Sequence, residues 1–555
     1  MYIDDKLYIA HCDEGPICLT GKMCNRHGLI AGATGTGKTV TLQVMAETFC
    51  QAGVPCFMAD MKGDLSGISQ VGKMSGFIEK RCPEFGIENP QFQSCPVRFY
   101  DVFGEQGFPM RTTVSAMGPQ LLARLMGLND TQAGVLNIVF RIADDNELLL
   151  IDMKDLRLML DFVGKNASKF TTQYGNVSSA SIGAIQRAVL EIETQGGDKF
   201  FGEPAFNVED LLDTENGKGI MSVLAADKLM LQPKLYSTFL LWLLTELYAT
   251  LPEVGDLPLP KLIFFFDEAH MLFDGTSKAL QDKLEQVIRL IRSKGVGIYF
   301  ITQSPTDIPE DILGQLGNRV QHALRAYTPK DQKAVRTAAQ TFRANPAFKT
   351  EDAILELGTG EALVSILDEK GAPTVVQRSK ILFPLSQIGA VTAGQRLDIQ
   401  NAAPDHIKEY NNFFDRESAY EVLTAVNEEI EAAANAEAER IAAEKAEIAR
   451  QKEEARLQKE QEKLRKEQER QEKAEQKSSG SSWTRTIFGT LIGAVTGSVA
   501  RSVGSSVAKS ITGGSSKSSK SCSTSAKSIA GKAAQSATTA VTKKVTSEIL
   551  KSIFK

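Results

Sequence analysis

The sequence predicts an α/β fold in which a parallel sheet carries a phosphate-binding loop. Residues 28–42 read GLIAGATGTGKTVTL and contain the pattern G-x-x-x-x-G-K-[ST] between an apolar strand and a helix with an apolar face. A second apolar strand at 262–266 ends in Asp267 and Glu268. A phosphate loop followed, much later in the chain, by a strand ending in two carboxylates indicates a protein that binds a nucleoside triphosphate.

The chemistry of the loop explains its residue types. Glycines allow backbone N–H groups to turn inward around a β-phosphate, and the N-terminus of the following helix adds a favourable partial charge. Lys38 is expected to reach the β- and γ-phosphates of ATP, and the Thr39 hydroxyl is expected to ligate Mg²⁺. The expected nucleotide-binding residues are Gly32, Ala33, Thr34, Gly35, Thr36, Gly37, Lys38, Thr39 and Val40.

The second half of the expected site comes from later strands. Asp267 is expected to hold Mg²⁺ directly or through water, and Glu268 to orient and polarise the attacking water. Gln303 follows an apolar strand at 297–302, and its amide is placed to contact the γ-phosphate or the lytic water. The alternative for Gln303 is an ordinary polar residue at the end of a strand.

Two arginines, Arg319 and Arg325, flank a strand that we expect at the edge of the sheet. In a ring-shaped ATPase such an arginine can reach the γ-phosphate held by a neighbouring subunit. A structural salt bridge is the alternative for each of them.

The run DMKGD at 60–64 also ends an apolar strand. Charged residues at the carboxyl end of a strand beside a phosphate loop lie where open α/β sheets bind ligands. A solvated turn is the alternative.

The pattern along the chain predicts five segments. Residues between about 109 and 218 show apolar positions spaced three and four apart, which indicates helices inserted into the α/β core. The segments are 1–102 and 219–415 for the two parts of the ATPase core, 103–218 for the inserted helical subdomain, 416–477 for a charged helix, and 478–555 for a basic low-complexity tail.

Charge and cysteine content indicate the environment in which the protein works. The net charge is −5, but residues 478–555 carry eleven Lys or Arg and one acid, a net of +10, which leaves −15 for residues 1–477. The eight cysteines form no C-x-x-C pair, so we expect reduced thiols and no zinc site. The N-terminal residues do not resemble a signal peptide, and no apolar run is long enough to cross a bilayer. We expect a cytoplasmic protein, with a possible location at the periphery of the inner membrane.

The last 130 residues have a different composition from the core. From 428 to 477 the chain is almost entirely Ala, Glu, Lys, Arg and Gln, and its few large apolar residues do not keep a heptad, so we expect a long solvated helix. Pairs such as Glu462 and Lys466 support such a helix. The tail contains an apolar, glycine-spaced stretch at 483–499, which fits either an anionic membrane surface or a disordered basic arm.

Five blocks of sequence resemble one known group of proteins. They are NRHGLIAGATGTGKT (25–39), ADMKGDLSG (59–67), FFFDEAH (264–270), RSKGVGIYFITQSP (292–305) and GEALVS (360–365). In this order they resemble the YjgR-like bacterial ATPases of the HerA/FtsK superfamily of ring-forming P-loop motors. The resemblance covers about residues 1–400. It implies a RecA-like core, a homohexameric ring and ATP-driven pumping of duplex DNA, with Gln303 as the sensor and a trans-acting arginine near 319–325.

The resemblance stops at the N-terminus. HerA proteins carry an N-terminal β-barrel that docks a nuclease, and the 27 residues before the phosphate loop are too few to form one. A HerA-type nuclease partner is therefore not expected. Two functions remain open: a DNA translocase, and an ATPase that acts on protein or at a membrane surface through its basic tail.

Overall fold

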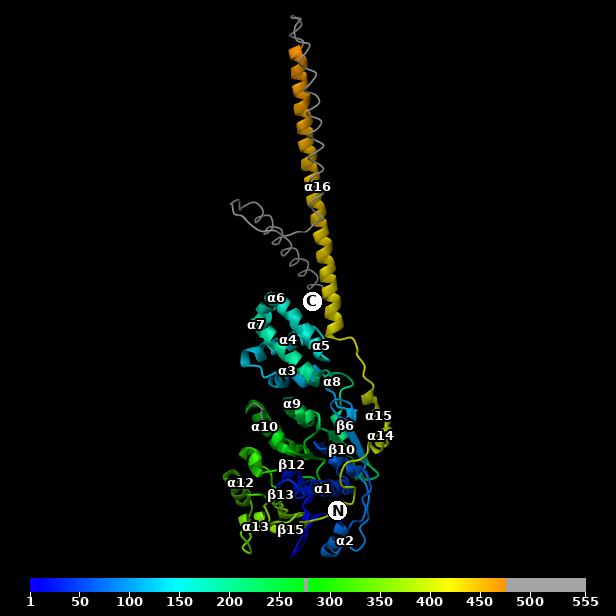
Figure 1. The fold of residues 1–555 in the computed structure, drawn as a ribbon, viewed down its shortest axis with the longest axis vertical. Helices are drawn as coiled ribbons and strands as arrows, with labels where there is room; N and C mark the ends of the chain where they lie inside the picture. The colour runs from blue at the N-terminus through cyan, green and yellow to red at the C-terminus, as the bar shows by residue number, and fades with distance from the viewer. Residues whose placement is uncertain (274–277, 476–555) are drawn as a thin grey trace, which may run out of the picture. The chain divides into compact units, whose positions relative to one another are not determined.

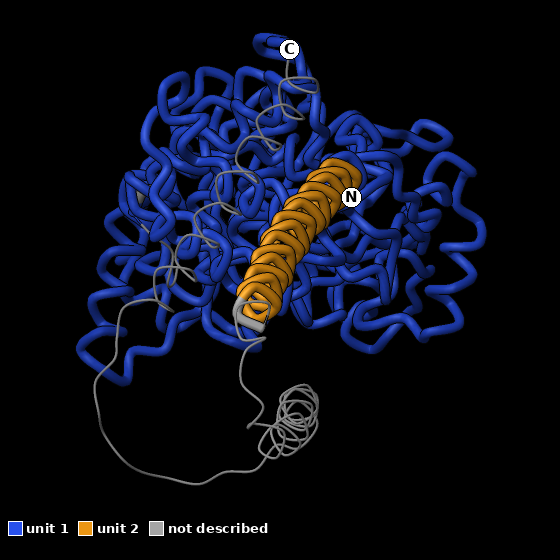
Figure 2. Tube along the Cα trace, turned by 90° about the horizontal axis from the view of Figure 1, so that it is seen from above, with its two compact units in different colours: residues 1–423 blue, residues 424–555 orange. Residues whose placement is uncertain are grey.

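The computed structural model describes residues 1–273 and 278–475, and the chain divides into two compact units, Met1–Leu423 and Thr424–Lys555 (Figure 2). The first unit is built on one 13-stranded sheet whose larger part is parallel. In spatial order the parallel strands are β13 (Asn318–Gln321), β4 (Gly28–Ala31), β12 (Val296–Thr302), β11 (Leu262–Phe266), β5 (Cys56–Asp60), β10 (Met221–Ala225), β6 (Val97–Asp101) and β7 (Phe108–Pro109).

Antiparallel strands extend the sheet beyond β13. They are β14 (Glu361–Ser365), β15 (Gln377–Ile381), β2 (Lys6–Cys12) and β1 (Tyr2–Ile3), with β3 (Gly15–Leu19) paired to β2. The strands that precede the phosphate loop, β1 to β3, therefore belong to the main sheet. A separate small hairpin is formed by β8 (Thr214–Glu215) and β9 (Lys218–Gly219).

Register aligns the carboxyl ends of the central strands. Ala31 of β4 pairs with Thr302 of β12, and Phe266 of β11 pairs with Phe300 of β12 and Ala59 of β5. The loops that follow these four strands therefore emerge at one edge of the sheet. This is the edge at which open α/β sheets bind their ligands.

The central strands are apolar because both faces of the sheet are covered. β11 reads LIFFF and is fully buried. On one face Phe265 packs with Tyr299 and with Phe49 of α1 (Lys38–Gln51), with ring centroids 5.5 and 6.3 Å apart. On the other face Phe266 stacks with Phe300, and Phe264 with Phe57. The hydrophobic core therefore packs against both faces of the strands whose carboxyl ends form the site.

The remaining helices of the α/β part surround this sheet (Figure 1). They are α2 (Gly76–Arg81), α9 (Pro233–Thr250), α10 (Lys278–Ile291), α11 (Glu310–Leu313), α12 (Pro329–Gln340), α13 (Thr350–Glu356), α14 (Ala393–Ala402) and α15 (Asp405–Lys408).

Six helices separate β7 from β8 and lie together in Figure 1: α3 (Val114–Leu125), α4 (Asp130–Asp145), α5 (Met153–Lys165), α6 (Ala167–Tyr174), α7 (Ser179–Ile192) and α8 (Asp198–Phe200). Their own apolar stripes are buried, as in α5, where Leu156, Leu160 and Val163 have no exposed surface. Side chains define the helix starts: α4 begins with a capping box in which Asn129 and Gln132 bond each other's backbone N–H.

The segment after β15 crosses α1 and is fixed to it by a buried carboxylate. Glu47 of α1 accepts the backbone N–H of Leu385 at 2.7 Å and that of Ser386 at 3.0 Å, and it also accepts the Ser386 hydroxyl. Gln43, one turn earlier, donates to the carbonyl of Gln387. These bonds satisfy donors that are buried away from water, so they stabilise the helix that carries the phosphate loop.

The start of α16 (Ala419–Glu475) is held by the helical segment of the first unit. Asp155 of α5 is fully buried and accepts the Ser418 hydroxyl at 2.5 Å and the Tyr420 N–H at 2.9 Å. The Ala419 N–H bonds the carbonyl of Leu149. Residues 416–423, which include the first residues of α16, therefore belong to the first unit.

The rest of α16 has the solvated character that its composition predicts. Ile448, Leu457 and Leu464 are each about half exposed. The expected pair of Glu462 and Lys466 is present at 2.7 Å. Side-chain pairs along the helix, rather than a buried stripe, support this part of the chain.

One expectation about the sheet is wrong. The strand of Arg319, β13, is short and lies directly beside the phosphate-loop strand β4, with β14 on its other side. β13 ends at Gln321, so Arg325 lies on the loop that follows this strand. Local pattern could not reveal this, because the pairing of β13 with β4 joins segments almost 300 residues apart.

Among the described residues no helix is long and apolar enough to cross a membrane. The seven cysteines in this part of the chain are free thiols. The expectations for residues 478–555, including the membrane-binding stretch, lie outside the described residues.

We predict that Glu47→Ala lowers the free energy of unfolding of the first unit by about 2–4 kcal/mol, since it leaves two buried N–H groups without an acceptor. Urea unfolding followed by tryptophan fluorescence measures this change. The matched control is Glu253→Ala, at an exposed position, which should stay within about 0.5 kcal/mol of the parent. Equal stability of the two variants would contradict the structural role of Glu47.

Candidate active site

The phosphate-binding loop connects β4 to α1 and has the backbone that its glycines allow. Gly35 and Gly37 have φ of 79° and 114°, values that side-chain-bearing residues rarely adopt. The Thr36 hydroxyl donates to the carbonyl of Ala33 at 2.7 Å, which closes the turn. Gly32 is needed for a different reason: a Cβ there would lie 2.5 Å from Cβ of His322.

Lys38 lies at the start of α1, where the loop ends. Its ammonium donates to the carbonyls of Gly32 at 2.7 Å and Ala33 at 3.1 Å, so it lies across the concave side of the loop. Burial lowers the pKa of Lys38, whereas the carboxylates of Glu268 and Asp267 act in the opposite direction. Thr34 and Gly35 are exposed, Gly32 and Thr36 are buried, and Ala33, Gly37, Lys38, Thr39 and Val40 are half-buried.

His322 supports the loop from beneath and is a residue that the sequence analysis did not single out. Its Nε2 lies 2.8 Å from the Thr41 hydroxyl of α1, and its Nδ1 lies 2.9 Å from the carbonyl of Glu361. Burial lowers the pKa of His322 to about 4, with a further contribution from Lys38, so the ring is neutral at pH 7. The only signal in the sequence was a polar residue at the end of a strand, and its meaning depends on β13 lying beside β4.

Asp267 and Glu268 end β11 at the same edge of the sheet. Both side chains are largely buried, and the Glu268 N–H donates to the Asp267 carboxylate at 3.0 Å. Burial and the neighbouring Glu268 carboxylate raise the pKa of Asp267 to about 6. Glu268 has φ of 47°, an uncommon backbone conformation for a non-glycine residue.

Three polar side chains surround the Glu268 carboxylate. Lys62 donates to Oε1 at 2.7 Å, Gln303 donates to Oε2 at 3.3 Å, and Nδ1 of His270 lies 3.5 Å from Oε2. Burial alone would raise the pKa of Glu268, but the bond and the charge of Lys62 outweigh it, and the pKa is lowered. The structure therefore brings Gln303 and Lys62 to Glu268, contacts that the sequence did not predict; the expected contact of Gln303 with the γ-phosphate or the lytic water stays a prediction.

Lys62 is positioned by the loop that follows β5. The Asp60 carboxylate accepts the N–H groups of Lys62, Gly63 and Leu65 at 3.3, 2.7 and 3.2 Å, which fixes the backbone of the turn. Burial and the nearby Asp64 carboxylate raise the pKa of Asp60 to about 7. The DMKGD run is therefore an ordered loop of the site and not a solvated turn.

The oxygen donors expected for Mg²⁺ suit such a cation. Thr39 lies in the first turn of α1, and Asp267 supplies a largely buried carboxylate; hydroxyl and carboxylate oxygens are the ligands that Mg²⁺ takes beside water and phosphate. The buried hydroxyl of Tyr236 has no hydrogen-bond partner among the described residues, and burial together with the Asp267 charge raises its pKa.

The two candidate arginines have different surroundings. The guanidinium of Arg319 donates to the carbonyls of Leu316 at 2.8 Å, Leu313 at 2.9 Å and Thr341 at 3.1 Å, so it holds its own chain together. This is a structural role, although through carbonyls and not through a salt bridge.

Arg325, by contrast, is exposed and lines a cavity of about 710 Å³. The same cavity is lined by Ala33 and Thr34 of the phosphate loop and by His270 and Gln303. Arg325 therefore lies on the flank of its own nucleotide site.

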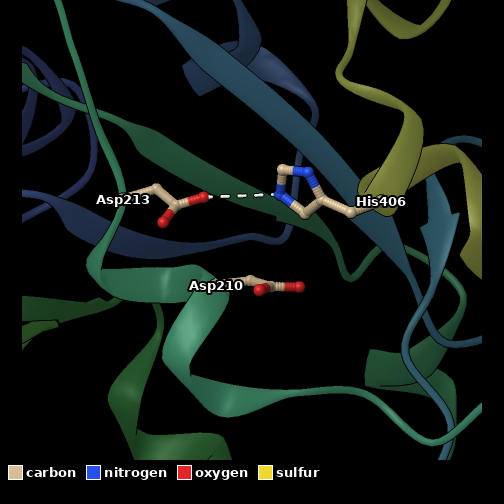
Figure 3. Close-up of side chains that lie close together, drawn as sticks. All are labelled: Asp210, Asp213 and His406. Carbon is tan, nitrogen blue, oxygen red and sulfur yellow. Dashed lines mark ion pairs between the residues drawn. The ribbon is translucent and has the colours of Figure 1, made fainter.

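A second group of titratable side chains, Asp210 and Asp213 from the segment before β8 and His406 from α15, lies close together (Figure 3). An ion pair of 3.6 Å joins His406 to Asp213, which also pairs with Arg98 at 2.7 Å, and Asp210 accepts the Tyr410 hydroxyl at 2.6 Å. The carboxylates are occupied by an arginine and a tyrosine. The group therefore ties the segment of α15 to the core.

The phosphate loop on β4, the Asp-Glu pair on β11 and the intervening β12 define a P-loop ATPase with a RecA-like α/β core. Comparison with known proteins agrees with this class. The family described as helicase HerA-like C-terminal matches residues 5–520, and the chain belongs to this family.

Individual relatives are more distant. The DNA double-strand break repair helicase HerA of Sulfolobus acidocaldarius is 30% identical over 121 residues, which are 22% of this chain and 23% of that protein, so the match spans less than a quarter of the relative. Among solved structures, the unbound bacterial conjugative coupling protein TrwBdeltaN70 has a TM-score of 0.46 and 17% identity, covering 71% of this chain and 92% of that one. VirB4 of Thermoanaerobacter pseudethanolicus has a TM-score of 0.42 and 15% identity, covering 67% and 96%.

We predict that Lys38→Ala and Glu268→Gln abolish turnover in different ways. Lys38→Ala removes the cation at the loop and should weaken ATP binding about tenfold or more. Glu268→Gln keeps the shape but removes the carboxylate that accepts a proton, so ATP should bind normally while kcat falls by about 10²–10⁴. Binding of a fluorescent ATP analogue and steady-state turnover separate the two effects. Turnover by Glu268→Gln at the parent rate would show that another group is the base.

Proposed function

We propose that the chain is a Mg²⁺-dependent ATPase that moves duplex DNA as a homohexameric ring. The observation that carries the proposal is the meeting of a phosphate loop and an Asp-Glu pair at one edge of the sheet, in a chain that belongs to the HerA-like helicase family. A relative named as a DNA repair helicase supports DNA as the polymer.

Each site residue has a distinct part in hydrolysis. The phosphate loop and Lys38 bind the β- and γ-phosphates, and Thr39 with Asp267 would hold Mg²⁺, which neutralises phosphate charge when bound. Glu268 takes the proton of the attacking water. Gln303, exposed at the tip of β12 and 3.3 Å from Glu268, orients that water and the carboxylate. Because β12 lies between β4 and β11, this amide reaches both halves of the site.

A ring is supported by the open flank of this site. The cavity beside Ala33, Thr34 and Gln303 is lined by exposed charged side chains, among them Arg325, Lys330 and Lys333. A neighbouring subunit seated against such a flank completes the site with charges from both chains. Of the two candidate arginines we favour Arg325, because the donors of Arg319 are already bonded within its own chain. Arg325 lines the cavity of its own site, but its side chain is exposed on the flank that a neighbouring subunit would cover, so it can extend toward the site of that neighbour.

Residues 1–477 are acidic overall, so DNA binding requires a local arrangement of cations and not net charge. A ring meets this requirement by repeating a few lysines and arginines around a channel. The alternative function, action on protein or at a membrane surface, depends on the basic tail at 478–555.

We predict that duplex DNA stimulates ATP turnover of the full chain at least about threefold, and that the stimulation falls steeply as salt rises, since phosphate contacts release counterions. The assay is steady-state hydrolysis with and without duplex DNA between low and physiological salt, with Glu268→Gln as the inactive control. A chain ending at residue 477 tests the tail. Turnover that ignores DNA but rises on anionic vesicles, only with the tail present, would favour the alternative function.

We predict that an arginine acts between subunits. Arg325→Ala should lower turnover in a homogeneous ring, and mixing it with Glu268→Gln should restore part of the activity, because one type of mixed interface has both an intact arginine and an intact carboxylate. Arg319→Ala, which removes bonds to its own chain, should lose stability and gain nothing from mixing. A chain that stays monomeric with ATP and Mg²⁺ yet hydrolyses normally would contradict the ring.

A further inference from the structure

The ion pair between Lys62 and Glu268 joins two groups with different access to solvent. The Lys62 side chain is 55% exposed and that of Glu268 only 10%, although their charged atoms are 2.7 Å apart. The lysine thus reaches from the surface into the site and ends on the carboxylate that we expect to accept a proton.

The ion pair with Lys62 occupies the Glu268 carboxylate and thereby opposes its expected role as proton acceptor. Oε1 accepts from Lys62, while Oε2 accepts from Gln303 and lies 3.5 Å from His270. A carboxylate bonded to an ammonium is a weaker proton acceptor and is less free to turn toward a water molecule. The arrangement therefore restrains Glu268.

The backbone of Lys62 is fixed, and its side chain is the movable part. Asp60 accepts three N–H groups of the loop, and Ser66, which donates to the Gly63 carbonyl at 2.7 Å, accepts the Val391 N–H at 3.0 Å. Only the flexible lysine stem, half exposed to solvent, can leave the carboxylate without breaking this structure. An anion arriving from solvent competes directly with Glu268 for the ammonium.

We propose that Lys62 couples binding of duplex DNA to ATP hydrolysis: a DNA phosphate takes the ammonium away from Glu268 and thereby frees the carboxylate. The inference rests on the proposed function for the identity of the polymer. Lysine suits this task because its ammonium is a compact point charge with three donors on a flexible stem, and it binds phosphates without the fixed geometry of arginine. Lys62 is a positioning residue, since it acts through Glu268.

The test compares Lys62→Met, which keeps the stem and removes the charge, with Lys62→Arg, which keeps the charge. Lys73→Met, an exposed lysine on the segment that follows the same loop, is the matched control. Turnover of the full chain is measured with and without duplex DNA at saturating ATP and Mg²⁺, together with KM for ATP. Binding of a fluorescent ATP analogue shows that each variant is folded.

The expected results distinguish a restraint of Glu268 by Lys62 from a purely structural role of Lys62. Lys62→Met should raise the DNA-free kcat about threefold or more at unchanged KM, and DNA should then stimulate it less than about twofold. Lys62→Arg and Lys73→Met should keep the parent's low rate and full stimulation. Adding Glu268→Gln to Lys62→Met should abolish the extra turnover, which shows that it passes through Glu268.

Two results would overturn the proposal. A DNA-free rate of Lys62→Met at or below the parent rate means that the lysine assists Glu268 instead of restraining it. A raised rate with undiminished stimulation by DNA means that the polymer acts elsewhere. If the parent chain ignores DNA, the proposed function fails separately, and the DNA-free rate of Lys62→Met alone then decides whether the restraint exists.

Discussion

The parallel pairing of β12 between β4 and β11 is the constraint on which the rest of the site depends. β4 carries the phosphate loop and β11 carries the Asp-Glu pair, and they come from segments more than 200 residues apart. Their carboxyl ends meet only because β12 hydrogen-bonds to both in register. The complete burial of β11 and β12, and their largely apolar sequences, follow from this position, since helices cover both faces of a central parallel strand.

The site is held from below by buried polar groups. His322 joins the loop following β13 to α1, and Glu47 joins the other end of α1 to the segment at 385–387. Each of these bonds satisfies a group that water cannot reach, so losing one leaves an unpaired polar atom in the core. The helix that presents the phosphate loop is thus fixed at both ends, while Lys62, Gln303 and Arg325 remain exposed around the loop.

Local sequence was sufficient where a residue's role depends on its neighbours in the chain. The phosphate loop and the strand ending at Asp267 were predicted at their observed positions, because a motif and an apolar run are both local signals. The position of β13 and the roles of His322 and Lys62 were not predictable. Each depends on which strands are neighbours, and a single sequence does not encode pairing in any local pattern.

Four acidic side chains surround the site expected for an anionic nucleotide at the carboxyl edge of the central strands, so the balance of charge there affects nucleotide binding. Asp60, Asp64, Asp267 and Glu268 lie near two lysines, Lys38 and Lys62. Burial raises the pKa values of Asp60 and Asp267, and the neighbouring carboxylates raise them further. A free triphosphate would add to the repulsion. A divalent cation held by Thr39 and Asp267 would offset this repulsion, so metal and nucleotide would favour each other's binding. Such an acidic edge would favour the magnesium complex of ATP over free ATP. Within it, the proposed role of Lys62 depends on its ion pair with Glu268, which restrains the one carboxylate that we expect to accept a proton.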